Sequence, residues 1–98
     1  MTVRFTPEAE ADLGEAFAWY TKRGAALGLE FLASVADVPR RIEALPQSAP
    51  EVHHGIRRAL LHRFPYCVFY LLESGGPVVL GCFHASRDPS AWRVRAGA

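Results

Sequence analysis

Hydrophobic and polar positions follow two different periods along the chain. From residue 7 to residue 46, apolar side chains recur every three or four positions, which is the spacing of one face of an α-helix. From residue 56 to residue 84, short apolar runs rich in β-branched and aromatic residues alternate with segments of Gly, Pro and Ser, which is typical of strands and turns. The pattern therefore predicts helices first and strands afterwards.

A short strand and a first helix are predicted at the N-terminus. Val3 and Phe5 alternate with polar neighbours, as in a half-buried strand. Thr6 has the side chain of a helix N-cap, and Pro7 fits the first helical position because it has no N–H to leave unpaired. We expect this helix to begin at Pro7 and to end before Gly24, after two basic residues in its last turn.

A second helix is predicted from residue 27 to residue 46, after a turn at residues 24–28. Pro39 lies inside its apolar pattern and cannot donate a backbone hydrogen bond to the carbonyl of Val35. For this reason we expect the helix to kink or split near Asp37. The two predicted helices should pack as a hairpin.

Three strands are predicted at residues 56–62, 65–73 and 77–84. In the middle run both alternating sets of positions are apolar, so this strand should be central and covered on both faces. The helical hairpin covers one face, and the other is left either to a partner or to the chain's own C-terminal tail, Val94 included. The predicted fold is α+β, one domain over residues 1–98: a short N-terminal strand, a helical hairpin, and a three-stranded antiparallel meander packed on the hairpin.

Composition argues against a membrane protein or a metalloprotein. No run of 18 apolar residues is present and no signal peptide opens the chain, so we expect a cytoplasmic protein. Cys67 and Cys82 lie inside apolar runs without neighbouring ligands, which favours buried free thiols over a disulfide or a metal site. Neither a metal nor a cofactor is expected.

Charge is divided unevenly between the two halves of the chain. Residues 1–52 carry five Lys or Arg and eight acids, a net charge of −3, whereas residues 53–98 carry six Arg and two acids, a net charge of +4. Such a basic half suits an acidic protein partner or a nucleic acid. A solvated surface with Arg side chains lying over apolar area explains it equally well.

Two segments carry a family resemblance. They are GIRRALLHRFPYCVFYLL at residues 55–72 and VVLGCFHASRDPSAW at residues 78–92. Together with the order of the predicted elements, they resemble the RelE/ParE superfamily of bacterial toxins, in particular its ParE-like branch, over nearly the whole chain. The resemblance implies a growth-arresting toxin of a type II toxin–antitoxin system, neutralised by an acidic antitoxin of the ParD or RelB type.

The resemblance leaves three functions open. ParE-like members are associated with poisoning DNA gyrase, RelE-like members cut messenger RNA in the ribosomal A site, and a relative that only binds the antitoxin would do neither. A ribonuclease needs a general base, cations and a proton donor. The resemblance implies that RNA-cutting relatives supply them as a Lys/Arg cluster on the sheet with a Tyr, or a His–Tyr pair, near the C-terminus. The tail from Arg87 on has no Tyr, Lys or Glu, and Lys22 is the only Lys, so this set is incomplete and an enzyme is not favoured. If the protein is a nuclease, its candidate residues are Arg58, His62, His84 and Arg87.

The same residues have structural alternatives. Arg58 and His62 should share a strand face because their separation is even, but Arg58 and Arg87 could instead pair with acids such as Asp88, and His84 could bond the backbone at a strand end. For a gyrase-binding toxin, the candidate target-binding residues are Arg87, Trp92, Arg93 and Arg95, with the Trp92 ring either exposed for contact or folded onto the sheet.

Four aromatic residues are candidates for contact with the antitoxin. Trp19 and Tyr20 are adjacent in the first helix and cannot both point into the hairpin core, so one should be exposed. An amphipathic or extended antitoxin segment would lie across apolar surface on the hairpin and the sheet. The candidate antitoxin-binding residues are Trp19, Tyr20, Tyr66 and Tyr70.

Overall fold

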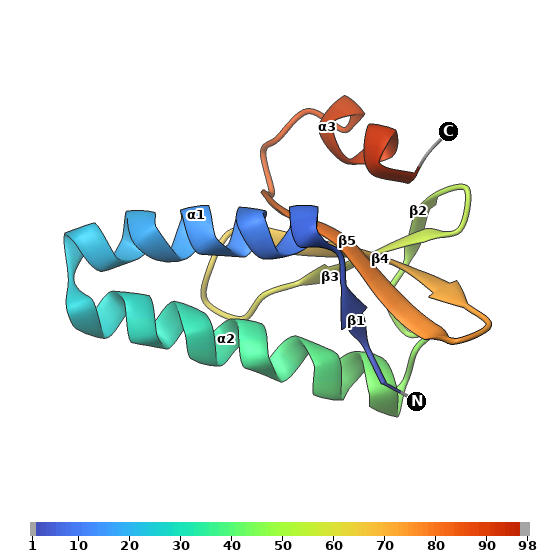
Figure 1. Ribbon diagram of the computed structural model, residues 1–98, viewed down its shortest axis with the longest axis horizontal. Coiled ribbons are helices and arrows are strands. Elements are labelled where there is room, and N and C mark those ends of the chain that lie inside the picture. The colour runs from blue at the N-terminus through green and yellow to red at the C-terminus, as the bar shows by residue number, and fades with distance from the viewer. Residues whose placement is uncertain (1, 97–98) are drawn as a thin grey trace.

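Two antiparallel helices cover one face of a five-stranded sheet, and a short helical tail lies on the other face (Figure 1). The computed structural model describes residues 2–96. In chain order the elements are β1 Arg4–Phe5, α1 Pro7–Arg23, α2 Ala25–Ala44, β2 Glu51–His53, β3 Ile56–Leu60, β4 Tyr66–Glu73, β5 Gly76–His84, α3 Ser90–Arg93 and the 3₁₀ turn η1 Val94–Ala96.

The strand order in the sheet is β1-β5-β4-β3-β2. β3, β4 and β5 form the predicted antiparallel meander, and β1 pairs in parallel with β5 through Arg4 opposite Val78 and Phe5 opposite Val79. The α+β class and the hairpin-plus-meander arrangement are confirmed. The short strand β2, which pairs antiparallel with β3, was not predicted.

α1 begins as the sequence predicts. The Thr6 hydroxyl accepts a hydrogen bond from the backbone N–H of Ala9 at 3.1 Å, and Pro7 is the first helical residue. The predicted turn over residues 24–28 is wrong, because only Gly24 separates the two helices. Gly28 is a helical residue at a close contact instead: a Cβ built there would lie 3.2 Å from the Cα of Thr21 on α1.

α2 is continuous through Pro39, so the predicted split of this helix is not found. Val38 is fully buried and Ile42 is 2% exposed, one on each side of the position where Pro39 breaks the hydrogen-bond ladder. Packing of these side chains against the sheet stabilises the helix across the missing bond.

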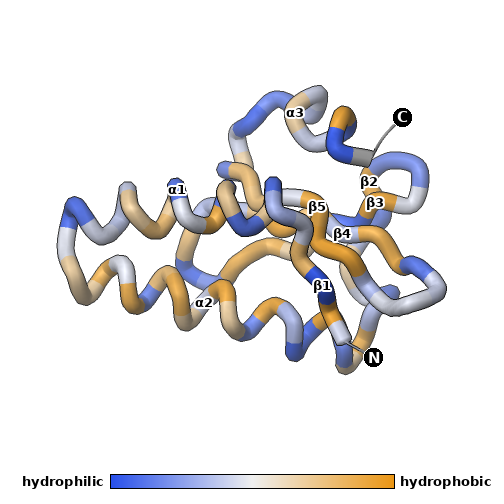
Figure 2. Tube along the Cα trace, viewed as in Figure 1, coloured by the Kyte–Doolittle hydropathy of each residue, from blue (hydrophilic) through white to orange (hydrophobic). Residues whose placement is uncertain are grey.

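β4 is covered on both faces, as predicted. Val68 and Tyr70 face the helices, whereas Phe69 faces the tail, where the ring of Trp92 stacks on it with 4.8 Å between ring centroids. The chain's own tail therefore covers the second face, but through Trp92 and not through Val94, which is 74% exposed. Figure 2 shows β5 as a nearly continuous hydrophobic segment between the two layers.

Both cysteines are buried free thiols, as predicted, and they belong to different core clusters, Cys82 on the helix side and Cys67 on the tail side. Burial, followed by the nearby Asp12 carboxylate and the Cys67 thiol, raises the pKa of Cys82 to about 12, so this thiol is unreactive at neutral pH. Within the described residues, no helix is both long and apolar enough to cross a membrane.

Candidate functional site

The four nuclease candidates do not all line one groove. Arg58 lies opposite Phe69 in the β3–β4 register, on the tail side of the sheet. β3 ends at Leu60, and the His62 imidazole turns toward α2, where its Nε2 lies 3.6 Å from Oδ2 of Asp37. The expectation that Arg58 and His62 share a strand face is therefore wrong, because the strand ends two residues before His62.

His84 and Arg87 do line one groove, of about 210 Å³, together with Trp19 and Tyr66. The two strand partners Tyr66 and His84 place their rings 5.4 Å apart. Sequence reasoning missed the acids of this groove. Asp12 and Glu15 line it from α1, and their only sequence signal is their place on the polar side of an amphipathic helix.

The groove residues that bear on acid–base chemistry are His84 and Tyr66. The Nδ1 atom of His84 accepts the backbone N–H of Ser86 at 3.1 Å, which leaves Nε2 as its only free nitrogen. Burial, and then the neighbouring Tyr20 and Cys82, raises the pKa of Tyr66, so this phenol stays protonated. The only arginine in the groove is Arg87, whose guanidinium lies 5.4 Å from the ring centroid of Phe83.

The four aromatic residues predicted to contact an antitoxin differ in exposure. Trp19 is 48% exposed and stacks under the Arg23 guanidinium, whereas the adjacent Tyr20 is buried and stacks on Phe31 with 5.2 Å between centroids. The prediction that only one of this pair points inward is confirmed. Tyr70 is fully buried, and its hydroxyl donates to the carbonyl of Pro46 at 2.8 Å. Trp19 and the half-buried Tyr66 remain accessible to a partner.

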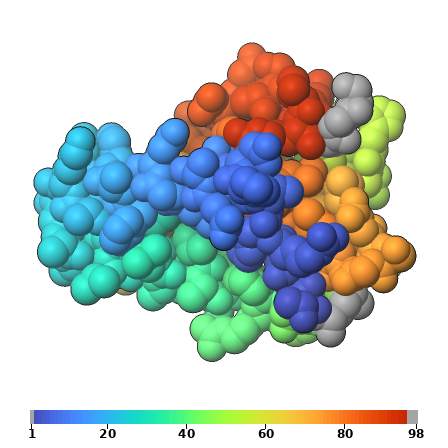
Figure 3. Space-filling view, viewed as in Figure 1, coloured from blue at the N-terminus to red at the C-terminus, as the bar shows by residue number. Residues whose placement is uncertain are grey.

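The predicted target-binding residues occupy three environments. Trp92 is buried, so of its two interpretations the ring folded onto the sheet is confirmed. Arg95 donates from Nη1 to Oδ2 of Asp12 at 2.9 Å and to the carbonyl of Leu80 at 3.1 Å, which gives it a structural role. Figure 3 shows the C-terminal segment lying against the first half of α1, where this ion pair forms. Arg87 and Arg93 are exposed.

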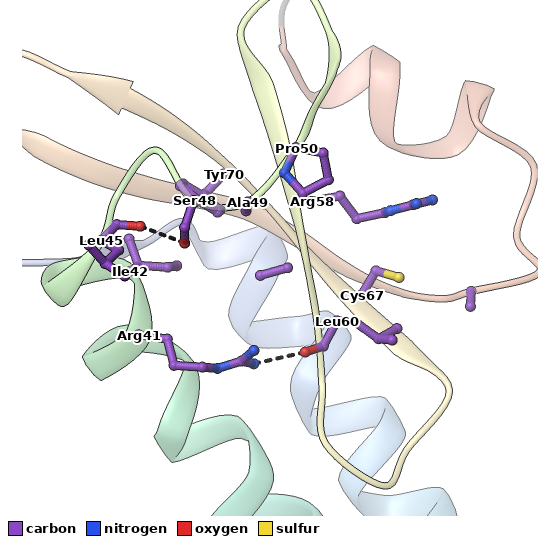
Figure 4. Close-up of a pocket in the computed structure, with 12 residues that line it drawn as sticks. Arg41, Ile42, Leu45, Ser48, Ala49, Pro50, Arg58, Leu60, Cys67 and Tyr70 are labelled. Atoms are coloured by element: carbon purple, nitrogen blue, oxygen red, sulfur yellow. Dashed lines mark hydrogen bonds between the residues drawn. The ribbon is translucent and has the colours of Figure 1, made fainter.

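A second groove, of about 420 Å³, opens between the end of α2 and β3 and was not predicted from the sequence. Figure 4 shows Arg41 reaching from α2 to the carbonyl of Leu60, a hydrogen bond of 2.8 Å, while Arg58 points away from Arg41. Leu45 and Leu60 on its wall are 65% and 56% exposed. The groove offers apolar area to a partner segment, whereas the β3 edge beside it already bonds Pro50 and Arg41.

A metal centre has no support in the part of the chain that the structure describes. There, no three side chains of His, Cys, Asp or Glu come close enough together to hold a metal ion.

Comparison with known proteins gives the family. The family model described as "ParE toxin of type II toxin-antitoxin system, parDE" matches residues 3–89. The chain is similar in fold to a solved structure of a chromosomal ParDE toxin–antitoxin system from P. aeruginosa, with a TM-score of 0.64 and 21% identity over 86% of this chain and 95% of that one. No curated protein matches the sequence significantly. Because the family model spans most of the chain, the protein belongs to the ParE toxin family of type II toxin–antitoxin systems.

Proposed function

We propose that the chain is a single-domain cytoplasmic toxin that arrests growth by binding DNA gyrase and stabilising its cleaved complex with DNA. The observation that carries the proposal is the small number of nuclease candidates around His84: Arg87 lines its groove, but Arg58 does not, and His62 lies near Asp37 on α2. A phosphorane formed beside His84 would have Arg87 as its only arginine in that groove. A poison that acts by binding requires no such cluster.

Family membership implies an antitoxin partner, and we propose a ParD-like one. Its apolar segment would cover large apolar side chains that the helical hairpin leaves in solvent, because such side chains mark partner surfaces when they gather on one face. Trp19 on α1 is 48% exposed, and Leu29 and Leu32 on α2 are 65% and 42% exposed. The acidic part of the antitoxin would meet the basic C-terminal half.

Trapping of gyrase tests the proposal directly. Purified chain is added to gyrase, ATP and supercoiled plasmid, and the reaction is stopped with detergent and protease. Accumulation of linear plasmid, reversed by the antitoxin, is the expected result. His84→Gln should trap as well as wild type, because a binding poison needs no acid or base.

The competing function is ribosome-dependent cleavage of messenger RNA, which the groove around His84 would serve. It predicts that translating ribosomes with the chain yield cut messenger, and that His84→Gln abolishes the cut. Cleaved messenger together with uncleaved plasmid would refute the gyrase proposal. Pulse labelling in cells separates the two as well, since DNA synthesis falls first for gyrase and protein synthesis falls first for the ribosome.

A further inference from the structure

Three arginines surround one buried aromatic cluster on the tail side of the sheet, and we call them the arginine rim: Arg58, Arg87 and Arg93. The cluster is Phe69, Phe83 and Trp92. Arg93 lies 5.5 Å from the ring centroid of Trp92, Arg87 lies 5.4 Å from that of Phe83, and Arg58 is the strand partner of Phe69. Since Phe69 packs 4.8 Å from Trp92 and 6.0 Å from Phe83, the three cations belong to one surface.

The rim is exposed and carries uncompensated charge. All three side chains are in solvent. Among the described residues, no rim arginine forms an ion pair. Five other arginines do: Arg4, Arg40, Arg41, Arg63 and Arg95. One nearby acid is Asp88, whose carboxylate accepts the backbone N–H of Ser90 at 2.8 Å and whose pKa is lowered by the Ser90 hydrogen bonds and also by Arg93. A second is the exposed Glu15, which lines the same groove as Arg87, whereas Asp12 in that groove is paired with Arg95. Three guanidiniums against these two carboxylates leave a net positive surface.

The rim presents charge and polar groups more than apolar area. The rings of its aromatic cluster are at most 7% exposed, and Ser86 in the loop before α3 and Ser90 at the start of α3 are exposed to solvent. Large apolar side chains lie on the hairpin instead, where Trp19 and Leu29 are exposed. An amphipathic antitoxin segment suits the hairpin, whereas the rim suits a polyanion without an apolar face.

We propose that the arginine rim binds the phosphate backbone of duplex DNA. Guanidinium groups stay charged at any physiological pH and bind phosphate oxygens through two parallel N–H donors. Stacking beside aromatic rings restricts where Arg87 and Arg93 point, which reduces the ordering cost of binding. The biological use of this contact rests on the proposed function: the DNA would be the segment that gyrase holds, so that the toxin contacts both members of the cleaved complex.

Salt-dependent binding to a labelled duplex of about 20 base pairs tests the rim, with fluorescence anisotropy as the readout. Three phosphate contacts predict a slope of about −2.7 for log affinity against log salt, which is about 40-fold weaker binding at 200 mM than at 50 mM salt. Each of Arg58→Gln, Arg87→Gln and Arg93→Gln should reduce the slope by about 0.9, and the triple variant should lose binding. The matched control has the same charge change at Arg4, Arg40 and Arg63, which are exposed outside the rim, and should bind within about twofold of wild type.

Two results overturn the rim proposal. One is equal DNA affinity of the folded triple variant and wild type, with folding checked by urea denaturation. The other is displacement of the duplex by an acidic polyglutamate peptide at lower concentration than by unlabelled DNA, which would mark the rim as a protein-binding surface. The gyrase trapping assay separates the two proposals. If the wild-type chain traps gyrase but its DNA binding does not depend on the rim arginines, the rim proposal alone is refuted. If DNA binding depends on the rim arginines but the chain does not trap gyrase, the proposed function alone is refuted.

Discussion

The ion pair of Asp12 with Arg95 fixes the C-terminal segment, and its loss should destabilise the protein measurably. Oδ2 of Asp12 accepts from Nη1 of Arg95 at 2.9 Å and from the backbone N–H of Cys82 at 3.0 Å, and Oδ1 accepts from Nη2 at 3.2 Å. β1 pairs with β5 only at Val78 and Val79. Beyond them, the ion pair supplies the hydrogen-bond partners that a neighbouring strand would give to the outer edge of β5: Arg95 donates to the carbonyl of Leu80, and Asp12 accepts from the N–H of Cys82.

The size of the expected destabilisation follows from the partial burial of the ion pair. The side chains of Arg95 and Asp12 are 27% and 14% exposed, which places the pair between two measured limits. Breaking a buried pair costs about 3–5 kcal/mol, and breaking a surface pair costs about 0–1 kcal/mol. Asp12→Asn keeps the shape and one acceptor for Cys82, so we expect a loss of about 2 kcal/mol in the free energy of unfolding. For a chain of this size the melting temperature should fall by about 8–16 °C.

A double-mutant cycle isolates the pair. Urea denaturation of Asp12→Asn, Arg95→Gln and the double variant should give a coupling free energy of about 1–2 kcal/mol. Glu10→Gln is the matched control, since Glu10 is exposed on the same helix, and it should change stability by less than about 0.5 kcal/mol. Coupling below about 0.5 kcal/mol would refute the reasoning, because the two charges would then contribute independently.

Three further predictions concern packing and pH. Gly28→Ala should destabilise the protein by about 1–3 kcal/mol in urea because its Cβ meets Thr21, and a net gain near the helix-propensity value of about 1 kcal/mol would contradict the close contact. Trp92→Ala should cost about 3–5 kcal/mol of unfolding free energy and weaken the near-ultraviolet circular dichroism signal, whereas a loss below about 1 kcal/mol would place the ring outside the core. Desolvation, then His54 and Arg93, lowers the pKa of His53, so protons bind the unfolded chain more tightly. The stability that this histidine contributes above about pH 6.5 should therefore decline on acidification. Melting temperature measured against pH should show this decline in the wild type and a smaller one in His53→Gln.

The fold was predictable where local chemistry and hydrophobic period agree. Thr6 and Pro7 specify a helix start from their own side chains, and the structure contains the cap. β4 was predictable as a central strand because both of its faces are apolar. β2 was not, since it is three residues long and its pairing with β3 depends on a turn with His54 and Gly55 at positive φ.

The turn over residues 24–28 and the split at Pro39 were mispredicted for tertiary reasons. Gly28 has the composition signal of a turn, but its use is to let α1 and α2 approach, which depends on Thr21 seven positions earlier. Pro39 has the signal of a helix break, but burial of Val38 and Ile42 overrides the lost hydrogen bond. Neither cause is visible in a local window of sequence.

The candidate site was less predictable because it depends on where strands end. Alternation places Arg58 and His62 on one face only while the strand continues, and β3 stops at Leu60. The register shift between Phe69 and Tyr70 likewise alters which β5 residues face each side. The groove around His84 also needs Trp19 and Glu15 from α1, whose distance from β5 no spacing rule gives.

The C-terminal segment joins the fold to the proposed function. Trp92 and Arg95 attach this segment to the rest of the fold: the Trp92 ring stacks on Phe69, and Arg95 forms the ion pair with Asp12. Arg93, between them in sequence, is thereby held on the exposed side with its charge available. A substitution of Trp92 or Arg95 can thus abolish activity by detaching the C-terminal segment, even if neither side chain contacts the target. Functional conclusions therefore require variants of Arg93 and the other rim residues, compared at matched free energy of unfolding.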